Sequence, residues 1–370
     1  MRPAIGALPM QKISSLIDGG FIINALNSNI QSGSLDLTLS SEGYRVRGAF
    51  LPAYDETVRD ALKRVGAQRL HDKAILENGS CYVYLLKEHI QQLPTGVYSY
   101  SNPKSSSGRL DIHVRLLADR VSRYDKIPEL YSGPLWVMIS PKKLPVVVAE
   151  GITLLQARFF NGDTRFSNID LELNFGANGG LLFDQNGNRI GFRDQRHSDA
   201  DGSVILTLGL NFDVPGFEVV ETGEPIEMWR KDYYDPEYFF RTVIVSNNAI
   251  SLSAHEFYIL SSREFVRVPE NFACEMVPMD EKSGELRSHY AGFIDPGWGI
   301  GRDGSTLGRP LTLEVRSFDS GLIIQDGQPI TKIRYEKMTE IPELHYDEHA
   351  PTYALQYGPK LSKHFKEWRK

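Results

Sequence analysis

The stretch GSLDLTLS, residues 33–40, returns later in the chain as GSVILTLG, residues 202–209. Six of the eight positions are identical or similar in the two stretches. One change is not conservative, because the carboxylate of Asp36 is replaced by the aliphatic side chain of Ile205. Alternating apolar residues bounded by glycine predict a β-strand in both places. The chain therefore carries the same predicted strand twice, and keeps an acidic group in only one copy.

Three more pairs of segments repeat in the same order. They are YVYLLKEHIQQLP (82–94) with FYILSSREFVRVP (257–269), KSSSGR (104–109) with KSGELR (282–287), and PLWVMIS (134–140) with PLTLEVR (310–316). Counted from the first residue of each pair, the four offsets are 169, 175, 178 and 176 residues. Ordered matches at a near-constant offset indicate a tandem duplication. We predict two copies of one domain, residues 1–163 and residues 164–370.

The composition favours β structure. The 370 residues include 32 Gly, 20 Pro, 17 Tyr and 18 Phe, which is typical of strands joined by many turns. We expect a mainly β fold with a few short helices, two of which are predicted at residues 10–18 and 55–66, the second capped by Asp55. The dipeptide Asn186-Gly187 predicts a hairpin turn. The basic stretch GPKLSKHFKEWRK (358–370) is predicted to be a solvated end.

Charge and cysteine content exclude several classes of function. The formal net charge of −6 argues against a general nucleic-acid or membrane-surface binder. The two cysteines, Cys81 and Cys274, cannot form a disulfide framework or a zinc cluster, and the nine histidines show no metal-ligand spacing. No apolar run approaches the length of a membrane span, and the N-terminus has no signal-peptide pattern, so a cytoplasmic location is predicted.

Three short stretches carry candidate chemistry. KSSSGR combines the charged side chains of Lys104 and Arg109 with three hydroxyls, which suits phosphate oxygens, although an ordinary serine-rich loop has the same composition. AGFIDPGW (291–298) predicts a strand ending in a β-turn, which either has no ligand or holds the Asp295 carboxylate toward a ligand hydroxyl. Glu314 lies on a predicted strand, where a solvent-facing glutamate is the ordinary alternative to a functional one.

Together, and in this order, these stretches resemble the dCTP deaminase family of the trimeric dUTPase-like superfamily. IQSGSLDLTL (30–39) resembles the opening motif of that family, and YALQYGPKLS (353–362) resembles its C-terminal tail. The resemblance covers most of both copies. It implies two tandem dUTPase-like domains of the β-barrel or jelly-roll type.

The resemblance also implies a role for each matched position. Glu314 stands where the family has its catalytic glutamate. Ser105, Arg109 and Ala291 match the groups that surround the catalytic water. Asp295 matches the aspartate that binds the deoxyribose 3′-hydroxyl. The implied substrate-binding residues are Lys104, Ser106, Ser107, Gly108, Asp295, Thr312, Leu313, Tyr346 and Gln356, and no residue is assigned to a metal.

Under this resemblance the two copies complement each other. Met138 stands at the position of Glu314, and copy 1 reads ADRVSRYD (118–125) where copy 2 reads AGFIDPGW. Since sites of this family lie between neighbouring subunits, we expect one site per chain that uses both copies, in a monomer or a small homo-oligomer such as a dimer. The alternative is that copy 2 alone builds the site with Ser283 and Arg287.

The implied function is hydrolytic deamination of dCTP to dUTP and ammonia without zinc, with one carboxylate as general base. Mg²⁺ is expected to accompany the triphosphate, because the charge of the triphosphate exceeds that of the visible basic groups. The expected ligands are dCTP, with dUTP or dTTP as product or inhibitor. Two alternatives stay open: a dUTP diphosphatase, alone or combined with deamination, and a non-catalytic nucleotide-binding regulator. A diphosphatase of this superfamily needs a Gly-rich C-terminal phosphate loop, which this tail lacks.

Overall fold

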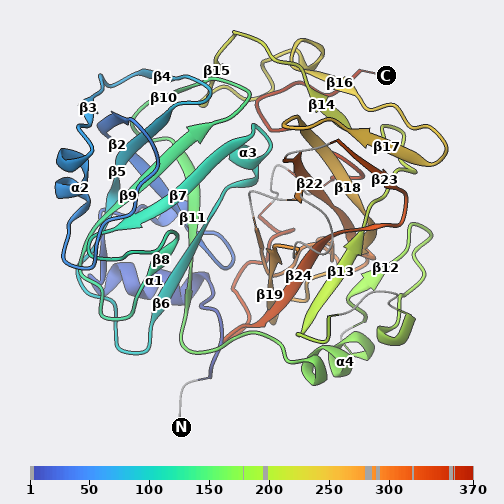
Figure 1. Cartoon of the computed structure of the whole chain (residues 1–370). Coiled ribbons are helices and arrows are strands. Elements are labelled where there is room, and N and C mark those ends of the chain that lie inside the picture. Colours follow the sequence, from blue (N-terminus) through green and yellow to red (C-terminus); the bar gives the residue numbers. More distant parts are fainter. Residues whose placement is uncertain are drawn as a thin grey trace. The chain divides into compact units, whose positions relative to one another are not determined.

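Chain contacts divide the protein into two units in the computed structural model, which describes residues 4–177, 179–194, 199–279, 286–288, 292–318, 321–349, 353 and 355–369. The N-terminal unit consists of Ala7–Gly162, Glu221–Pro236 and Ser362–Lys370. The C-terminal unit consists of Asp163–Val220 and Glu237–Leu361, with the short segment that ends at Gly6. The chain therefore returns to the N-terminal unit twice after leaving it at Gly162 (Figure 1).

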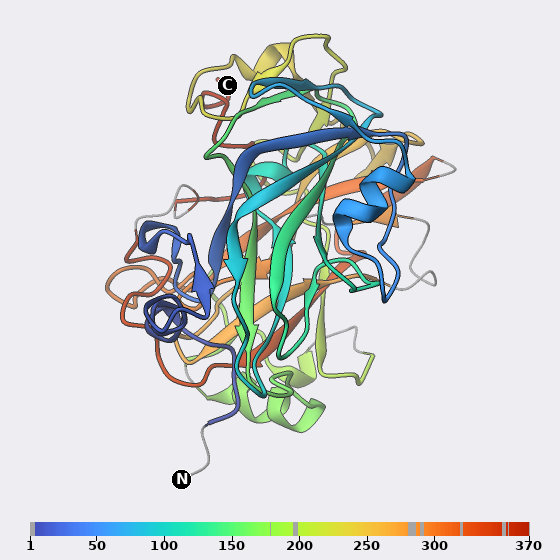
Figure 2. The same cartoon turned by 90° about the vertical axis from the view of Figure 1, so that its left-hand side faces the viewer.

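The N-terminal unit is built on one large sheet with strand order β7-β9-β5-β2-β11-β6-β8, to which β1 and β3 add at the side of β5 and β2. A small second sheet has the order β15-β10-β4. Figure 2 shows α1 and α2 beside the strands of this unit. The elements are α1 (Met10–Asp18), β1 (Ile22–Ile23), η1 (Asn27–Asn29), β2 (Leu35–Val46), α2 (Val58–Arg64), β3 (Gln68–Arg69), β4 (Ala74–Leu76), β5 (Cys81–Ile90), β6 (Tyr98–Pro103), α3 (Ser105–Gly108), β7 (Ile112–Ala118), β8 (Lys126–Ile127), β9 (Gly133–Pro141), β10 (Val146–Val148), β11 (Thr153–Phe160) and β15 (Ile226–Glu227).

The C-terminal unit has a sheet of order β16-β14-β18-β22-β20 with β12 beside β18, a second sheet of order β13-β24-β19-β21, and the pair β17-β23. The mainly β, two-domain fold with few short helices predicted from the sequence is confirmed. The elements are α4 (Asn168–Gly176), β12 (Leu182–Phe183), η2 (Phe192–Asp194), β13 (Ser203–Thr207), β14 (Phe217–Val219), η3 (Pro236–Tyr238), β16 (Phe240–Thr242), β17 (Ala249–Leu252), β18 (Phe257–Val266), β19 (Phe272–Val277), β20 (Leu286–Arg287), β21 (Phe293–Ile294), β22 (Arg309–Ser317), β23 (Leu322–Gln325) and β24 (Pro329–Lys337).

The two units use the same strand pairings in the same register. In the N-terminal unit Val83 lies opposite Met138 across β5 and β9. In the C-terminal unit Ile259 lies opposite Glu314 across β18 and β22, and each of these residues follows its counterpart by 176 positions. A residue of one unit can therefore be compared with its counterpart in the other by register, independently of sequence similarity.

A buried contact between a threonine and a glutamate recurs in both units. The Glu88 carboxylate accepts the backbone N–H of Thr38 at 2.8 Å, and the Glu264 carboxylate accepts that of Thr207 at the same distance. Burial raises the pKa of both carboxyl groups above its ordinary value. Both glutamates lie in the irregular part of their strand. The register shifts between Leu85 and His89 of β5 against β9, and between Ser261 and Phe265 of β18 against β22, so each glutamate lies where the ladder is interrupted and accepts a backbone donor.

The local predictions for helices and turns are mostly accurate. The helix expected at residues 10–18 is α1, and it ends at Gly19. The second expected helix is shorter than residues 55–66, and its N-cap is Thr57 rather than Asp55, because the Thr57 hydroxyl accepts the N–H of Asp60. At the predicted hairpin turn, the Asp184 carboxylate accepts the backbone N–H groups of two turn residues at 2.8 and 2.9 Å.

Each unit has its own apolar core. In the C-terminal unit the core joins the inner faces of the two larger sheets and includes Leu260, Leu313 and Tyr335. In the N-terminal unit an apolar cluster joins α2 to β5 and β9 through Leu62, Val83 and Met138.

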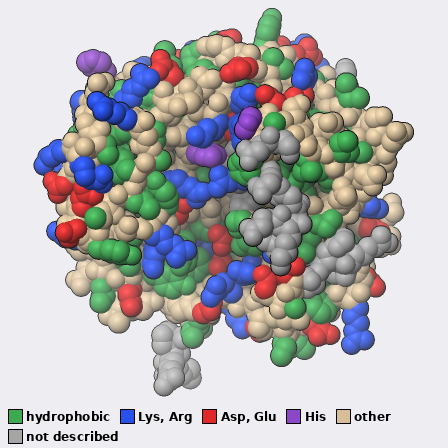
Figure 3. Space-filling view, in the orientation of Figure 1, with side chains coloured by type: hydrophobic (Ala, Val, Ile, Leu, Met, Phe, Trp, Pro, Cys, Tyr) green, Lys and Arg blue, Asp and Glu red, His purple; other side chains and the backbone are tan. Residues whose placement is uncertain are grey.

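Acidic and basic side chains are interspersed on the face drawn in Figure 3, in keeping with the small net charge. Within the described ranges, every helix is too short or too polar to cross a membrane.

Candidate active site

The KSSSGR stretch of the N-terminal unit forms a short helix that is attached to β11. Lys104 precedes α3, and its backbone N–H donates to the carbonyl of Leu154 at 2.9 Å. The Ser107 hydroxyl donates to the same carbonyl at 2.9 Å. Ser106, Ser107 and Gly108 are buried, whereas Lys104 and Ser105 are half-buried. Lys104 and Ser105 are therefore the most accessible residues of this stretch.

Asp36 of β2 forms an ion pair with Lys104, whose ammonium also donates to the Thr153 hydroxyl at 3.1 Å. This pair explains why the first copy keeps a carboxylate in GSLDLTLS. At the counterpart position Ile205 lies opposite Lys332, and the Lys332 ammonium bonds to Asp199 at 2.5 Å instead. We call Asp36, Lys104, Ser105–Gly108 and Arg109 the α3 cluster.

Arg109 directly follows α3 and is 3% exposed. Its backbone N–H donates to the carbonyl of Ser105 at 3.0 Å, which continues the helical turn. The Arg109 side chain is therefore shielded from bulk solvent.

The segment Ser362–Phe365, which we call the tail segment, packs against the α3 cluster. The sequence had predicted that it would lie in solvent. The Ser362 hydroxyl donates to the carbonyl of Ser106 at 2.8 Å and lies 2.9 Å from the Nδ1 atom of His364. Ser362, His364 and Phe365 are buried. The prediction of a solvated end was wrong for these residues, because small and aromatic side chains between the lysines provide a face that packs. The motif YALQYGPKLS (353–362) includes only Ser362 of this segment, and the sequence analysis assigned no site role to Lys363–Phe365.

Burial, and to a smaller extent the neighbouring Lys363 ammonium, lower the pKa of His364 to about 4, although a hydrogen bond to the Met228 carbonyl raises it slightly. The His364 imidazole is therefore neutral at physiological pH. A neutral ring bridges the Ser362 hydroxyl at 2.9 Å and the Met228 carbonyl at 3.3 Å, which fixes the tail segment between α3 and residues 226–236.

In the C-terminal unit, Glu314 lies in the middle of β22 and is only 2% exposed. The ordinary alternative of a solvent-facing strand glutamate is therefore wrong. Thr312, two residues earlier on the same face, is also buried, and Leu313 on the opposite face belongs to the apolar core. A carboxylate held in this position is shielded from bulk water.

Asp295 begins a β-turn in which the backbone N–H of Trp298 donates to the Asp295 carbonyl at 3.2 Å. Gly297 has a φ of 88°, and a Cβ atom at this position would lie 2.5 Å from the His345 side chain. Only glycine fits this turn without movement of the neighbouring chain. The turn fixes Asp295, which is buried.

The residues after β24 pack on this turn and on β22. The backbone N–H of Tyr346 donates to the Pro296 carbonyl at 2.8 Å, and the ring centroids of Tyr346 and Trp298 lie 5.1 Å apart. The Gln356 side chain donates to the carbonyl of Pro310 at 2.8 Å. We call Asp295, Thr312, Glu314, Tyr346 and Gln356 the Glu314 cluster, and all five are predicted site residues that belong to the C-terminal unit. Ala291, the remaining predicted residue of this unit, lies outside the described residues.

A buried ion pair that the sequence analysis missed lies beside the Glu314 cluster. Asp347 pairs with Arg309 at the start of β22 and accepts the backbone N–H of Gly301 at 2.6 Å. Asp347 is 2% exposed. One carboxylate therefore holds together the strand, the loop of residues 299–308 and the segment that contains Tyr346.

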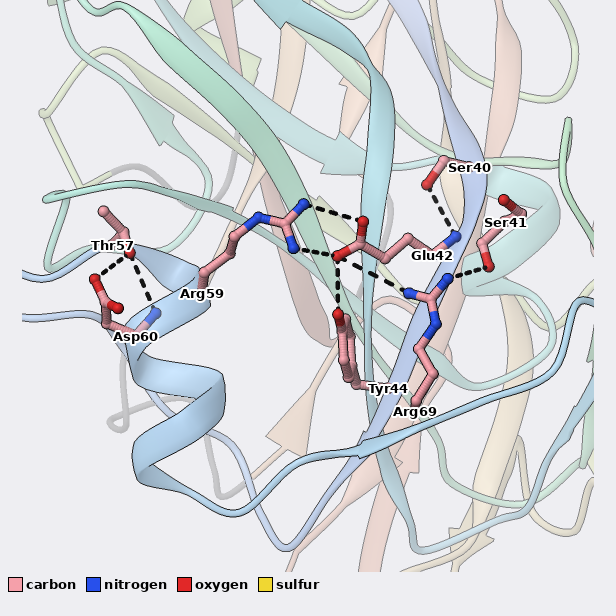
Figure 4. A network of polar contacts seen from close by, with 8 residues as sticks. All are labelled: Ser40, Ser41, Glu42, Tyr44, Thr57, Arg59, Asp60 and Arg69. Carbon is pink, nitrogen blue, oxygen red and sulfur yellow. Dashed lines mark hydrogen bonds and ion pairs between the residues drawn. The ribbon is translucent and has the colours of Figure 1, made fainter.

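The counterpart of Glu314 in the N-terminal unit is covered by α2. Met138 and Trp136 stand at the register positions of Glu314 and Thr312, and both belong to the apolar cluster with α2. The Arg59 guanidinium of α2 lies over the Trp136 ring, 5.0 Å from its centroid. It also donates to both Glu42 oxygens at 2.7 and 3.0 Å, and Figure 4 shows the other groups that reach this carboxylate. The position that holds the buried carboxylate in one unit is thus filled by apolar packing in the other.

The register corrects one sequence alignment. Strand β8 pairs with β6 as β21 pairs with β19, so the counterpart of the turn at Asp295 begins at Pro128 and not within residues 118–125. The backbone N–H of Tyr131 donates to the Pro128 carbonyl at 3.3 Å, and Leu130 has a φ of 59° at the place of Gly297. The N-terminal unit therefore has a proline where the C-terminal unit has the Asp295 carboxylate. The alignment by residue type failed because the two units differ in the length of the connection before this turn.

A second correction concerns Arg287. This residue lies opposite Arg316 in β22, as His113 lies opposite Ser140 in β9, so Arg287 is the counterpart of His113 and not of Arg109. The pairing of KSGELR with KSSSGR was therefore wrong. The alternative site formed by the second copy alone relied on Arg287 as the equivalent of Arg109, and the register does not support that equivalence. Ser283 lies outside the described residues.

Metal ligands do not cluster in the described part of the chain, where no group of three or more His, Cys, Asp and Glu side chains could hold an ion. Cys81 lies in the apolar cluster of the N-terminal unit and Cys274 in the core of the C-terminal unit. Burial raises the pKa of the Cys81 thiol, which disfavours the thiolate that binds metals.

Comparison with known proteins matches both units. The model of the 2′-deoxycytidine 5′-triphosphate deaminase N-terminal domain matches residues 4–163, and that of the C-terminal domain matches residues 188–365. A protein of Methanobrevibacter smithii named "dCTP deaminase, dUMP-forming" is 26% identical over 173 residues, which cover 44% of this chain and 79% of the relative. The crystal structure of 2′-deoxycytidine 5′-triphosphate deaminase from Agrobacterium tumefaciens is similar over 92% of this chain and 100% of that chain, with 34% identity and a TM-score of 0.81.

Proposed function

Because this chain belongs to the 2′-deoxycytidine 5′-triphosphate deaminase family, we propose that it hydrolyses the 4-amino group of dCTP to release ammonia. The observation that carries this proposal is the buried carboxylate of Glu314 on β22, beside the turn that fixes Asp295. A carboxylate shielded from bulk water is suited to proton transfer at a bound ring. The similarity to the Agrobacterium tumefaciens deaminase over nearly the whole chain supports the same chemistry.

In the proposed reaction Glu314 accepts a proton from a water molecule whose oxygen bonds to C4 of cytosine. The same carboxyl group passes that proton to N3, and then transfers the second water proton to the amino group, which leaves as ammonia when the C4–N bond breaks. Arg109 and Ser105 orient the water and offset the negative charge that develops at the ring. Ala291 contributes its carbonyl to the same water.

The remaining residues bind the nucleotide in this proposal. The Asp295 carboxylate accepts a hydrogen bond from the deoxyribose 3′-hydroxyl, and the turn at Gly297 that fixes this residue supports the role. Tyr346 and Gln356 contact the substrate from the segment after β24, and Thr312 with Leu313 supplies the strand edge next to the base. Lys104, Ser106, Ser107 and Gly108 bind the phosphates, with charge from the lysine and neutral donors from the serines.

The proposed Mg²⁺ arrives with the triphosphate, whose oxygens are its preferred ligands. Zinc is not part of the proposal, because the buried cysteines of this chain lie in separate apolar clusters. Activity that survives removal of transition metals by a chelator, with Mg²⁺ restored, is the expected result. Loss of activity that only Zn²⁺ restores would contradict this part of the proposal.

We assign one nucleotide site to each chain. The support is that the register counterparts of Glu314 and Asp295 in the N-terminal unit are Met138 and Pro128. The Met138 side chain cannot act as a general base, and the Pro128 side chain has no hydrogen-bond acceptor. Equilibrium titration with dCTP and the inactive Glu314→Gln protein is expected to give one nucleotide per chain. Two equivalent sites per chain would overturn this assignment.

The proposed product is dUTP. The second candidate is dUMP, formed by further loss of pyrophosphate, and it is favoured by the name of the Methanobrevibacter smithii relative. Both candidates are separated by one experiment, in which ammonia and pyrophosphate are measured in parallel during incubation with dCTP and, separately, with dUTP. Ammonia without pyrophosphate supports dUTP, pyrophosphate in equal amount supports dUMP, and release of neither excludes the enzyme activity.

A further inference from the structure

The turn that begins at Asp295 and its counterpart in the N-terminal unit are held by the same backbone contact. In the C-terminal unit the backbone N–H of Val268 donates to the Trp298 carbonyl at 2.9 Å. In the N-terminal unit the backbone N–H of Leu93 donates to the Tyr131 carbonyl at the same distance. Each donor lies shortly after one of two counterpart strands, β18 and β5. The repeated fold thus supplies this support in both units, and a contact made on one turn alone needs a separate explanation.

The two turns differ at their third residue. Leu130 has a φ of 59° and a side chain that is 50% exposed, so this turn forms with its third residue open to solvent. Gly297 stands at the same place with a φ of 88°, and a Cβ atom there would lie 2.5 Å from the Cβ and 2.6 Å from the Nδ1 atom of His345. The His345 side chain therefore lies directly against the backbone of the turn that carries the Asp295 carboxylate, and leaves no room for a side chain at position 297.

His345 is held in place through both its backbone and its ring. Its backbone N–H donates to the Glu348 carboxylate at 2.9 Å, and its carbonyl accepts the N–H groups of Glu348 and His349 at 3.0 and 3.3 Å. The Nε2 atom of the ring lies 3.5 Å from the Glu348 carboxylate and 3.8 Å from that of Glu270. The imidazole, which belongs to a residue only 7% exposed, therefore joins the turn at Gly297, the turn at Glu270 and its own turn.

The next residue connects the same segment to the turn a second time. The backbone N–H of Tyr346 donates to the Pro296 carbonyl at 2.8 Å. One segment therefore carries Tyr346, which contacts the nucleotide in the proposed function, and the side chain that packs on the turn of Asp295. A hydrogen bond weakens steeply when its angle departs from linear, so a carboxylate that recognises a sugar hydroxyl must be held in a fixed position.

We propose that His345 is a positioning residue that fixes the turn of Asp295 and thereby sets the preference for a sugar with a 3′-hydroxyl. The role of Asp295 in this inference rests on the proposed function. The packing of His345 on Gly297 does not, because it is a contact within the protein. The Cβ, Cγ and Nδ1 atoms of His345 make this contact, whereas Nε2 lies toward the two glutamates.

The experiment compares His345→Ala and His345→Asn with His349→Ala, a matched control that removes an exposed histidine four residues further along the chain. All variants are made in the Glu314→Gln background, which prevents turnover, and binding of dCTP and of 2′,3′-dideoxycytidine 5′-triphosphate is measured by calorimetry. His345→Ala is expected to weaken dCTP binding by about tenfold and binding of the dideoxy nucleotide by less than about twofold, because loss of a hydrogen bond to a charged group has this size. Asparagine keeps atoms in the places of Cβ, Cγ and Nδ1, so His345→Asn is expected to retain most of the preference for dCTP, and His349→Ala all of it.

The ratio of the two affinities separates a positioning role from a structural one. A histidine that only stabilises the fold would affect both nucleotides equally, and the fraction of folded protein cancels from the ratio because both titrations use the same preparation. An equal loss for both nucleotides in His345→Ala, an unaltered dCTP affinity in that variant, or a loss of preference in His349→Ala would overturn the inference. If the wild-type protein releases no ammonia from dCTP, the proposed function fails, and the two titrations still decide the role of His345.

Discussion

Met138 and Glu314 occupy the same register position in two sheets, Met138 opposite Val83 and Glu314 opposite Ile259. One position therefore carries a thioether in an apolar cluster and the other a buried carboxylate. We expect Glu314→Gln to lower the rate of ammonia release from dCTP by at least about 10²-fold, because an amide cannot accept the proton of water. Nucleotide binding is expected to survive, since the amide keeps the shape of the side chain.

The matched control for this change is Met138→Leu, a substitution of similar volume that is expected to leave turnover unaltered and to cost less than about 1.5 kcal/mol of stability. Met138→Glu in the Glu314→Gln background is expected to remain inactive and to unfold more readily, because it places a carboxylate inside the apolar cluster under α2. Recovery of ammonia release in that double variant would contradict the assignment of catalysis to the C-terminal unit.

The buried pair of Asp347 and Arg309 is expected to stabilise the C-terminal unit and to position Tyr346. Asp347→Ala leaves the Arg309 charge uncompensated, so we expect the free energy of unfolding to fall by about 3–5 kcal/mol. Chemical denaturation measures this change. Asp163→Asn, which removes one partner of the exposed pair with Arg165, is the control and is expected to change stability by no more than about 1 kcal/mol. Similar losses in the two variants would show that the buried pair has no special role.

Gly297→Ala is expected to disturb the turn that fixes Asp295. The alanine would need a φ of 88° and would bring a Cβ atom to 2.5 Å from His345, so the turn or the segment after β24 must shift. We expect KM for dCTP to rise more than for a nucleotide that lacks the 3′-hydroxyl, together with a loss of stability of about 1 kcal/mol or more. Gly304→Ala tests the backbone effect alone, because its φ is 74° but no atom lies within 4 Å of the added Cβ. Equal kinetic effects in both variants would refute the role given to the turn.

Acid is expected to weaken the tail segment through His364. The pKa of this imidazole is about 4 in the folded protein, below its ordinary value of 6.5. The unfolded chain therefore binds the proton first as pH falls, and stability decreases between about pH 6.5 and pH 4, by at most roughly 3 kcal/mol. In His364→Gln this part of the pH dependence is expected to disappear from thermal melts. The exposed His71→Gln serves as the control, and an unchanged slope in His364→Gln would exclude this origin.

The sequence predicted the elements that local patterns determine. α1, the repeat of GSLDLTLS and the strand that carries Glu314 all follow from periodicity and turn residues, which act over a few positions. The pairing of Asp36 with Lys104 could not be predicted, because it depends on β2 and β6 both lying next to β11. The contact between Ser362 and Ser106 joins residues 256 positions apart, and composition alone predicted solvent there.

The counterpart of Asp295 shows a different reason for failure. Residues 118–125 share residue types with AGFIDPGW, but the strand pairing of β8 places Pro128 at that position. Similarity of residue types therefore aligned the wrong segment with the turn at Asp295, and only the strand register identified the turn at Pro128 as its counterpart. Asp347 was missed for yet another reason, since a lone acidic residue in a loop carries no pattern until its partner Arg309 is known.

The assignment of Ser362–Lys370 to the same unit as Ala7–Gly162 has a consequence for how the protein is made. During synthesis the first 162 residues emerge from the ribosome about two hundred positions before the segment that completes their unit. Until then α3 lacks the Ser106–Ser362 contact, and the small sheet lacks β15 until residue 227 has emerged. A fragment ending at Gly162 would lack both segments, and a stop codon shortly before Ser362 would damage the half of the protein that is translated first. Co-translational folding of the unit that begins at Ala7 is therefore expected to remain incomplete until Ser362 and the residues after it have been synthesised.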